Sequence, residues 1–305
     1  MSIVERRGRT TIITVAESVP LKERPRLLLD EIRCRLLELW QYRELVKNLA
    51  TRDLKVRYKN SVLGVLWSLL NPLFMMVVFT VVFTVMRNEQ IGSFPMFVLI
   101  GLLPWQFFSN SVMSATSSIV GNANLINKVY FPREVLPLSA VLSNLVNFLL
   151  ALLVLWPIMF IFDIPLTGWA LLLPVVIATQ IIFTLGVSLL TATANVFYRD
   201  TQIILEVLLL AWFFLTPIFY SIEILPKSYE LWNGVYIDIH RWSRILNPMA
   251  SLVETYRVIL YGANGSGGAP PALDFLLRTI VTSVGILGLG TFFFYRYNAR
   301  FGEEV

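Results

Sequence analysis

The sequence has little charge and almost none of the side chains that build metal or disulfide sites. Only 15% of its 305 residues are charged, and it contains one Cys and one His. The single Cys34 rules out an internal disulfide, and the lone His240 cannot form a multi-histidine metal site. An HExxH motif and clustered cysteines are also missing from the sequence. We therefore predict no resident metal.

A nucleotide-binding motif is missing as well. No GxxxxGK[ST] sequence occurs, and the glycine-rich run 264–268 has no following lysine. An enzyme acting on lipid-linked sugars would need clustered acids or a base at the membrane surface. The nearest acidic side chains, Asp163, Asp200, Glu223 and Asp238, are scattered along the chain. We predict that the chain is not an enzyme and carries no cofactor of its own.

Hydrophobic residues dominate the composition. They make up 56% of the sequence, and the mean hydropathy is +0.68, values typical of membrane proteins. We expect no signal peptide in residues 1–25, because their only apolar patch, residues 12–16, is shorter than the roughly 7–15 residues of a signal-peptide hydrophobic region. Since roughly 20 apolar residues cross a bilayer, the charge-poor runs predict an all-α integral membrane protein. We expect six spans, at about 62–86, 94–116, 135–162, 169–197, 201–220 and 275–295.

Charged residues are rare even at the edges of these runs. Glu206 and Arg278 are the ionisable residues within them, and both lie near span ends. Ion-coupled transporters usually carry charged groups near mid-membrane, so this class is disfavoured. A membrane protein without its own energy source is better explained as a conduit that a partner drives.

The distribution of basic residues predicts the orientation. Fourteen of the 25 Lys and Arg precede Ser61, which favours contact with a membrane surface over nucleic acid. With six spans, nineteen Lys and Arg fall on the cytoplasmic side and six outside, as the positive-inside rule requires. Both termini are then cytoplasmic. A seven-span alternative would export Arg296 and Arg300 and lose this agreement.

Four regions follow from these patterns. They are an N-terminal extension (1–25), an amphipathic helix (26–60), a transmembrane domain (61–300) and a cytoplasmic tail (301–305). The amphipathic helix is too polar to span, so we expect it at the inner membrane interface, where its basic residues would also lie. Packing on a soluble partner is the alternative. Its apolar face is predicted to hold Leu39, Tyr42, Leu45, Val46, Leu49 and Ala50.

The outer region 221–272 contains one ambiguous segment. Residues 245–262 are apolar, but they include Glu254 and Arg257. Each charge near mid-bilayer costs about 2.5–3.5 kcal/mol on insertion scales, so a seventh span is disfavoured. We predict a re-entrant or interfacial helix whose backbone is shielded by protein or a water-filled cavity.

Five segments, in order, resemble a known family. They are RDLKVRYKNSVLGVLWSLLNP (52–72), NLINKVYFPREVLPL (124–138), NVFYRD (195–200), FFLTPIFYSIEILP (213–226) and LNPM (246–249). Together they resemble the permease subunit of ABC-2-type polysaccharide or polyol-phosphate exporters, which export O-antigen, capsule or teichoic acid. The resemblance covers about residues 36–300. It implies a homodimer in the bacterial inner membrane, with two copies of a separate ATPase that carries ATP and Mg, and a lipid-linked glycan as substrate.

The resemblance also implies where the ATPase docks. In loop 117–133, Pro132 forces Phe131 out of the helical region, so a short helix ending in an extended turn is expected. This loop would act as a coupling helix, and the turn at 198–200 as a second contact. A plain connector, and capping of the fifth span by Asp200, are the alternatives. The predicted coupling residues are Asn124, Leu125, Ile126, Lys128, Tyr130, Phe131, Arg133, Tyr198, Arg199 and Asp200.

Two further groups of residues are predicted. Aromatic faces pack against sugar rings without fixed direction, which suits a sliding polymer, although they also serve as lipid-facing bulk. The predicted channel residues are Trp67, Phe74, Phe79, Trp212, Phe213, Phe214, Phe219 and Tyr220. The interfacial helix would act as a gate through Arg52, Lys55, Arg57, Tyr58 and Lys59. By the same resemblance, short helices around 224–226 and 245–260 would close the exit.

Two other functions are considered for the chain. A permease of the same superfamily could export a drug or a small lipid instead of a glycan. An integral glycan-modifying enzyme is the second alternative, and the scattered acids speak against it.

Overall fold

The computed structural model describes residues 39–61, 63–64, 66–86, 93–222, 229–232, 235–262 and 265–304. The chain divides into two compact units, Met1–Leu45 and Val46–Val305. In the first unit, the described residues lead into helix α2 (Arg43–Tyr58), and the Arg43 guanidinium lies 5.5 Å from the centre of the Trp40 ring. The predicted extension 1–25 and the beginning of the amphipathic helix lie outside the described residues. All remaining elements belong to the second unit.

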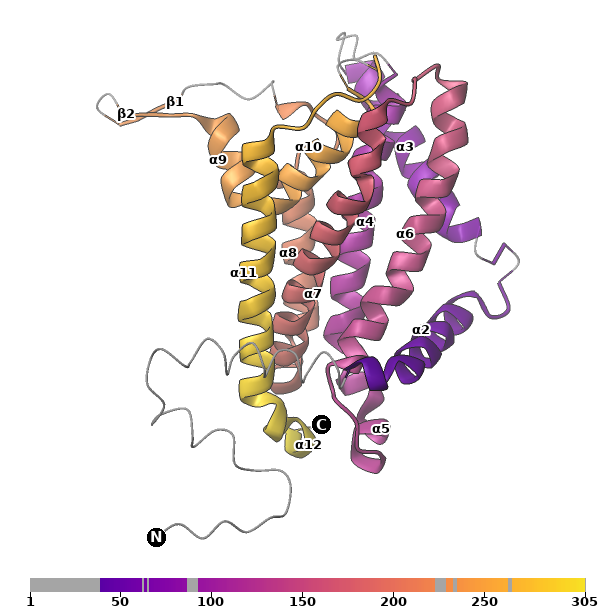
Figure 1. Ribbon diagram of the computed structural model, residues 1–305, viewed down its shortest axis with the longest axis vertical. Coiled ribbons are helices and arrows are strands. Elements are labelled where there is room, and N and C mark those ends of the chain that lie inside the picture. Colours follow the sequence, from indigo (N-terminus) through magenta and orange to yellow (C-terminus); the bar gives the residue numbers. More distant parts are fainter. Residues whose placement is uncertain are drawn as a thin grey trace. The chain divides into compact units, whose positions relative to one another are not determined.

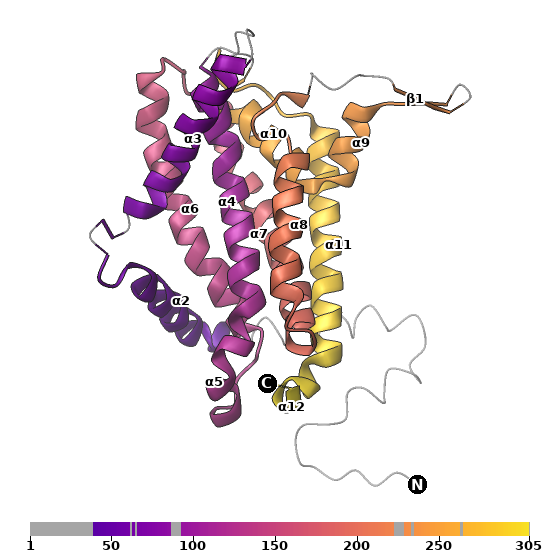
Figure 2. The ribbon, with the colours of Figure 1, turned by 180° about the vertical axis from the view of Figure 1, so that it is seen from behind.

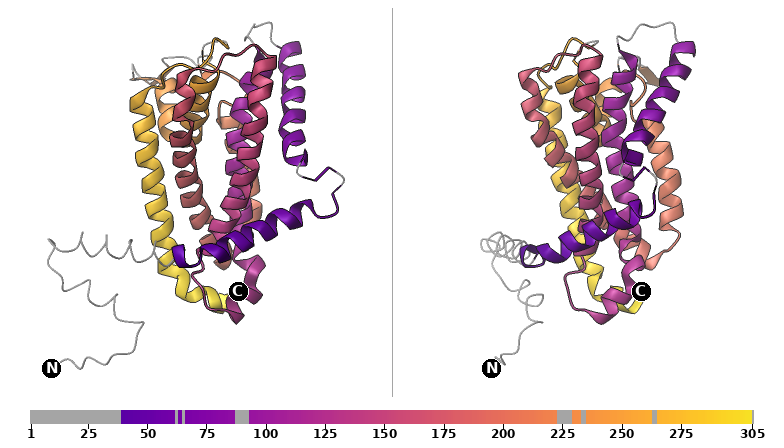
Figure 3. Two further views of the ribbon diagram at one scale, coloured as in Figure 1. Left: turned by 45° about the vertical axis from the view of Figure 1, so that its right-hand side comes forward. Right: turned by 90° about the vertical axis from the view of Figure 1, so that its right-hand side faces the viewer.

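The second unit is built mainly from helices, as predicted. Its long helices run side by side, and from Val46 onward α2 lies obliquely to them (Figures 1, 2 and 3). In chain order the helices are α3 (Leu66–Met86), α4 (Phe94–Ser118), α5 (Ala123–Lys128), α6 (Val135–Ile161), α7 (Leu173–Phe197), α8 (Thr201–Leu215), α9 (Ile239–Leu246), α10 (Pro248–Leu260), α11 (Leu273–Tyr297) and α12 (Phe301–Glu304). Short 3₁₀ turns precede α5, α7 and α12, at Val120–Asn122, Gly168–Leu172 and Asn298–Arg300.

One short hairpin departs from the all-α prediction. Strands β1 (Tyr229–Trp232) and β2 (Val235–Ile237) pair antiparallel, with Tyr229 opposite Ile237. The hairpin lies in the long outer region, where no strand was expected. It leaves the helical core unchanged.

Among the described residues, four helices are long and apolar enough to cross a membrane. They are Phe94–Ser118, Val135–Ile161, Gly168–Phe197 and Leu273–Asn298, close to four of the six predicted spans. The other two predicted spans correspond to shorter apolar helices, Leu70–Val82 within α3 and Thr201–Leu215. At about 1.5 Å per residue, the 15 residues of α8 reach only about 22 Å.

The predicted fifth span ends early for a local reason. Helix α8 stops at Leu215, before Thr216-Pro217, because proline offers no N–H to continue the helix. The Thr216 hydroxyl donates back to the Trp212 carbonyl at 2.8 Å and closes the last turn. Residues 216–221 then continue as irregular chain with bends.

Helix α4 forms the centre of the core. Most of its residues are buried, and it contacts α3, α6, α7, α8 and α10. Pro95 occupies the first turn, where a missing N–H leaves no hydrogen bond unmade. Inside the bundle, Gln180 of α7 donates to the Pro104 carbonyl and accepts from the Tyr256 hydroxyl, both at 2.7 Å. This network satisfies the buried polar groups that join α4, α7 and α10.

Helices α7 and α11 pack against each other more extensively than any other pair. Two glycines allow the close approach. A Cβ atom on Gly290 would lie 2.3 Å from the carbonyl oxygen of Gly186, and one on Gly186 would lie 2.6 Å from the backbone nitrogen of Leu287. Small residues at such contacts let helix backbones meet, which is how helices associate in a membrane.

Candidate functional site

The end of helix α2 is tied to helix α6. The apolar face of α2 buries Val46 and Leu49. At its last turn, the Arg57 guanidinium donates to Asn144 Oδ1 and the Tyr58 hydroxyl donates to Asn147 Oδ1, both at 2.9 Å. The amphipathic helix therefore ends at Tyr58 in a defined position against α6. If α2 moves as a gate, as predicted, it must either break these two hydrogen bonds or move together with α6.

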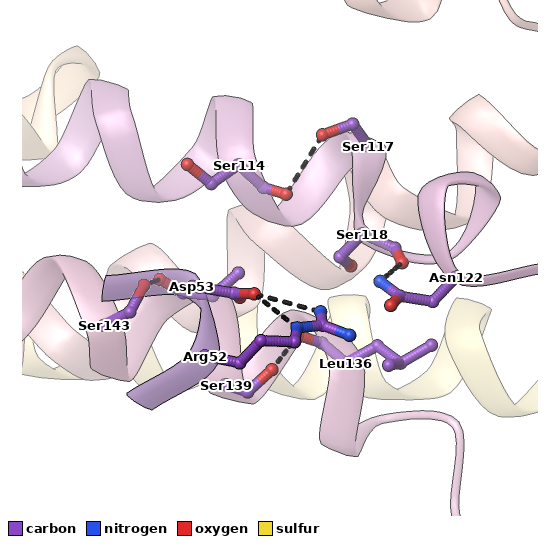
Figure 4. A network of polar contacts seen from close by, with 10 residues as sticks. Arg52, Asp53, Ser114, Ser117, Ser118, Asn122, Leu136, Ser139 and Ser143 are labelled. Atoms are coloured by element: carbon purple, nitrogen blue, oxygen red, sulfur yellow. Dashed lines mark hydrogen bonds and ion pairs between the residues drawn. The ribbon is translucent and has the colours of Figure 1, made fainter. Parts of the chain in front are cut away.

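The remaining predicted gate residues face solvent. Arg52 pairs with the neighbouring Asp53 at 2.9 Å, as Figure 4 shows beside serines of α4 and α6. Lys55 and Lys59 are exposed. The basic residues of the last turn also complement the negative end of the helix dipole. Their exposed charges suit the predicted contact with anionic lipid head groups.

The predicted coupling loop forms the short helix α5 at one end of the bundle (Figures 1 and 2). Tyr130 is 70% exposed, and Asn124 and Lys128 are also exposed. Leu125 and Ile126 are half-buried. These five residues present a mixed apolar and basic surface, as expected for a loop that meets a partner.

Two predicted coupling residues instead pack within the chain. Phe131 is only 6% exposed, so it does not stand on the surface as expected. The Arg133 guanidinium donates to the Asn298 carbonyl and lies 5.9 Å from the centre of the Phe301 ring. Partial burial lowers the pKa of Arg133 from its usual value. Both residues were expected at the surface of the loop, because nothing in the sequence indicates that the C-terminal segment returns to it.

The C-terminal segment packs against the end of loop 117–133. Phe301 is fully buried and packs edge-on against Phe294, with 5.2 Å between ring centres. The Tyr295 hydroxyl donates to Glu134 Oε1 at 2.7 Å, and Glu134 is only 8% exposed. We name these contacts, together with those of Arg133, the C-terminal clamp. The clamp holds the end of the predicted coupling loop against α11.

Removing one hydroxyl should weaken this clamp measurably. We expect Tyr295→Phe to lower the free energy of unfolding by about 1.5–3 kcal/mol, because it removes a hydrogen bond to a mostly buried carboxylate. The measurement is thermal unfolding of the purified chain in detergent. Tyr297→Phe is the matched control, since Tyr297 is exposed and should change stability by less than about 0.5 kcal/mol. Equal effects of the two variants would contradict the clamp.

The second predicted contact forms a tight turn between α7 and α8. Tyr198 is 74% exposed, and Arg199 and Asp200 are also exposed. Asp200 occupies the cap position of α8, but its side chain makes no capping hydrogen bond. The turn is closed instead by the Thr201 hydroxyl, which donates to the Tyr198 carbonyl at 2.5 Å. Capping by Asp200 is therefore not the role that the structure shows.

The predicted channel aromatics fall into three groups. Trp67 and Phe74 are exposed on α3, by 51% and 60%. Trp212 is held in the bundle, where its indole N–H donates to Asn247 Oδ1 at 2.8 Å. The other five form one aromatic cluster in which Phe79 stacks on Phe219, with 5.3 Å between ring centres. Its members are Phe79, Phe213, Phe214, Phe219 and Tyr220.

Asn247 joins the end of α8 to α10. Its Oδ1 accepts from the Ala250 backbone N–H at 3.1 Å and so caps α10, while its Nδ2 donates to the Thr216 hydroxyl at 3.0 Å. Pro248 follows at the first helical position, which favours a helix start. This explains the LNPM segment in structural terms.

Arg257, on helix α10, is buried inside the bundle. It is only 3% exposed, and its guanidinium donates to the carbonyls of Phe97 at 3.2 Å, Pro217 at 2.5 Å and Ile218. It also stacks on the Phe97 ring. Gly101 makes room, because a Cβ there would lie 2.7 Å from the guanidinium. Arg257, whose charge disfavoured a seventh span, thus provides hydrogen-bond donors for the non-helical chain that follows α8.

Sequence reasoning missed the polar residues of α6 that receive α2. Asn144 and Asn147 lie within a long apolar run, and polar residues at such positions commonly have a function. That signal was present in the sequence. The predicted exit segment around 224–226 lies outside the described residues.

Comparisons with known proteins agree with this architecture. The sequence pattern of the ABC-2 type transporter family matches residues 44–261. The chain is 36% identical to the O-antigen export system permease protein RfbA of Myxococcus xanthus, over 88% of this chain and 98% of that protein. A permease of the same name from Klebsiella pneumoniae is 32% identical, over 85% of this chain and 94% of its own length. The polysialic acid transport protein KpsM of Escherichia coli is 26% identical, over 78% of this chain and 88% of its own length.

The family match covers most of the chain and includes the end of α2, the coupling loop, the turn at 198–200 and the Arg257 helix. The first two relatives align over almost their whole length. The chain therefore belongs to the ABC-2 type transporter family, among its polysaccharide-export permeases.

Proposed function

We propose that this chain is the membrane subunit of an exporter that moves a lipid-linked, O-antigen-like polysaccharide across the bacterial inner membrane. A separate ATPase, which carries ATP and Mg, supplies the energy. The proposal is supported by two relatives that align over 88% and 85% of this chain, both of them named O-antigen export system permease proteins. The sequence, which lacks a phosphate-binding loop, is consistent with an external motor.

The proposed topology has six spans and two cytoplasmic termini. Four spans are the long apolar helices, and α3 provides another. Helix α8 forms the remaining span together with the chain after Leu215, which turns back where Arg257 satisfies its carbonyls. Non-helical backbone is tolerated at this depth only when protein shields it, as it is here. Helix α10 is then the re-entrant helix of the outer side.

Two copies of the chain would line the path. Helices α3 and α8 expose apolar faces that include Phe74, Val81, Val207 and Phe214, exposed by 60%, 58%, 64% and 55%. The exposed faces suit either lipid or a second copy, and the aromatic cluster lies between these two helices. In a homodimer, Phe74 and Phe214 would offer flat surfaces to a passing sugar chain.

The single observation that carries the partner-driven mechanism is the anchored coupling loop. Its tip at Tyr130 is exposed, while its end is fixed by the buried Phe131 and the C-terminal clamp. A force applied by an ATPase at the tip would therefore act on α6 and α11 rather than flexing a free loop. Because α6 also holds Arg57 and Tyr58, the same force reaches the end of α2.

Charge reversal at the tip of the loop tests this mechanism. We expect Lys128→Glu combined with Tyr130→Ala to lower both ATPase co-purification and glycan at the cell surface at least tenfold. Both residues are exposed, so the folding of the chain should be unchanged. Expression and thermal unfolding of the purified variant check this.

Arg241→Glu is the matched control, because Arg241 is also exposed and belongs to α9, which lies at the opposite end of the bundle from α5 (Figure 1). The control should retain both ATPase and export. Undiminished docking and export in the Lys128 and Tyr130 double variant would refute the coupling role. An ATPase activity stimulated by hydrophobic drugs, but not by a lipid-linked glycan, would refute the proposed substrate class.

A further inference from the structure

A polar pocket lies where the end of α2 meets α3, α4 and α6. Its volume is about 270 Å³. Five amide side chains line it, together with the flat indole of Trp67 and an apolar floor that includes Phe148. The five amides are Asn71, Gln106, Asn110, Asn144 and Asn147. So many amides in one recess of a membrane bundle require an explanation, since polar groups at membrane depth are costly.

Asn147 leaves one polar atom of this pocket unsatisfied. Its Oδ1 accepts from the Tyr58 hydroxyl, while its Nδ2 is buried and has no hydrogen-bond partner. Turning the amide over exchanges the two atoms and still leaves one of them unpaired. A buried donor without a partner is unfavourable, so a bound hydroxyl group that pairs with it would be favoured.

Asn144 provides the contrast. Its Oδ1 accepts from Arg57, and its Nδ2 donates to the Ala140 carbonyl at 2.9 Å. This amide is therefore satisfied within the protein. Of these two amides, only Asn147, one turn further along α6, keeps an unpaired polar atom.

The chemistry of the lining selects one class of ligand. None of its twelve lining residues is a carboxylate, so a bound cation is disfavoured. Its one charged residue, Arg57, already donates to Asn144, so a bound anion is also disfavoured. Neutral amides both donate and accept, as sugar hydroxyls do. The volume is below the roughly 300 Å³ of the smallest drug-sized pockets, so it suits a single ring.

We propose that this pocket binds one sugar ring of a glycan, with hydroxyls paired to Asn147 and Gln106 and the ring resting on Trp67. The sugar's origin rests on the proposed export function, whereas the pocket chemistry does not. Because Tyr58 closes on Asn147 from α2, an occupied pocket would report the presence of substrate to the interfacial helix.

Saturation-transfer NMR on the full-length chain in lipid nanodiscs tests the proposal. The probes are methyl α-D-mannopyranoside, methyl β-D-galactopyranoside and methyl α-L-rhamnopyranoside, with sn-glycerol 3-phosphate representing a lipid head group. We expect saturation transfer to at least one glycoside and a reduction of at least fivefold in Asn147→Leu. Leucine keeps the volume of the side chain but removes both polar atoms.

Asn195→Leu is the matched control. Asn195 is also a buried amide with one unpaired atom, but it does not line this pocket. It should keep the signal. If Asn147→Leu does not fold, Trp67→Leu replaces it, because Trp67 is 51% exposed and its loss should leave folding intact while removing the ring platform.

The absence of any glycoside signal in the wild-type chain would overturn the proposal. So would an undiminished signal in Asn147→Leu, or in Trp67→Leu where that variant replaces it, or binding of glycerol phosphate alone. Surface glycan in cells that lack the chain tests the export function separately. Glycoside binding with unchanged surface glycan would refute the export function and leave the sugar site standing.

Discussion

Gly290→Leu is expected to separate α7 from α11 and to prevent stable folding of the chain. The backbones meet at this point, and a Cβ on Gly290 would lie 2.3 Å from the Gly186 carbonyl oxygen. The neighbouring atoms are backbone, so no side chain can rotate away. Overpacking typically costs about 1–3 kcal/mol, and this contact should exceed the upper end of that range. The measurement is the yield of monodisperse protein and its thermal unfolding in detergent.

Gly288→Leu is the matched control on the same helix. A Cβ there meets nothing within 4 Å, and Gly288 is exposed. Leucine also has a higher helix propensity than glycine, so this variant should be as stable as the wild type or slightly more stable. Comparable yield and unfolding temperature in Gly290→Leu and Gly288→Leu would show that the close approach of α7 and α11 does not hold the bundle.

Arg257→Met is expected to open the bundle where helix α10 meets α4 and the chain after α8. It would leave the carbonyls of Phe97, Pro217 and Ile218 without their charged donor. Hydrogen bonds to a charged group contribute about 1.5–3 kcal/mol each, so the loss should exceed about 3 kcal/mol. The variant should unfold at a markedly lower temperature, and limited proteolysis should cut after α8. Surface glycan should fall with it.

Two further variants separate charge from geometry. Arg257→Lys keeps the charge but cannot donate to three carbonyls at fixed angles, so we expect an intermediate loss. Arg278→Met serves as the control, because Arg278 is only partly buried and stacks on Phe275. It should change stability by less than about 1 kcal/mol. Full stability of Arg257→Met would show that these carbonyls find other partners.

The helices were predictable to within a few residues. Runs without charge must form helices in a membrane, because every backbone group needs an internal partner. The observed α4 and α6 begin at Phe94 and Val135, as the runs of uncharged residues predicted. The end of α8 at Leu215 was not predicted, although Pro217 was visible in the sequence. An apolar run continues past a proline even where the helix does not.

The candidate site was predicted in part. The exposure of Tyr130, Lys128 and Tyr198 agrees with surfaces that meet a partner, and their roles stay predictions. Phe131 and Arg133 were predicted to face a partner, but both side chains pack within the chain. Their true neighbours come from residues 298 and 301, which sequence spacing cannot bring together. Aromatic composition predicted channel residues, but it did not show that Phe79 packs with Phe213 and Phe219 while Phe74 stays exposed.

The sequence by itself determined the chemistry and the class of this protein. Its charge-free runs predict membrane helices, its basic N-terminal flank predicts an orientation, and five of its segments resemble a transporter family that a separate ATPase drives. Only the tertiary structure decided which polar groups meet. Helix packing brings together residues that are far apart in the chain. Arg257 donates to the Phe97 carbonyl, Tyr58 donates to Asn147, and Gly186 lies against Gly290. The helix propensity of each segment does not predict which distant residues meet. The buried polar groups named here nevertheless find their hydrogen-bond partners only through those long-range contacts.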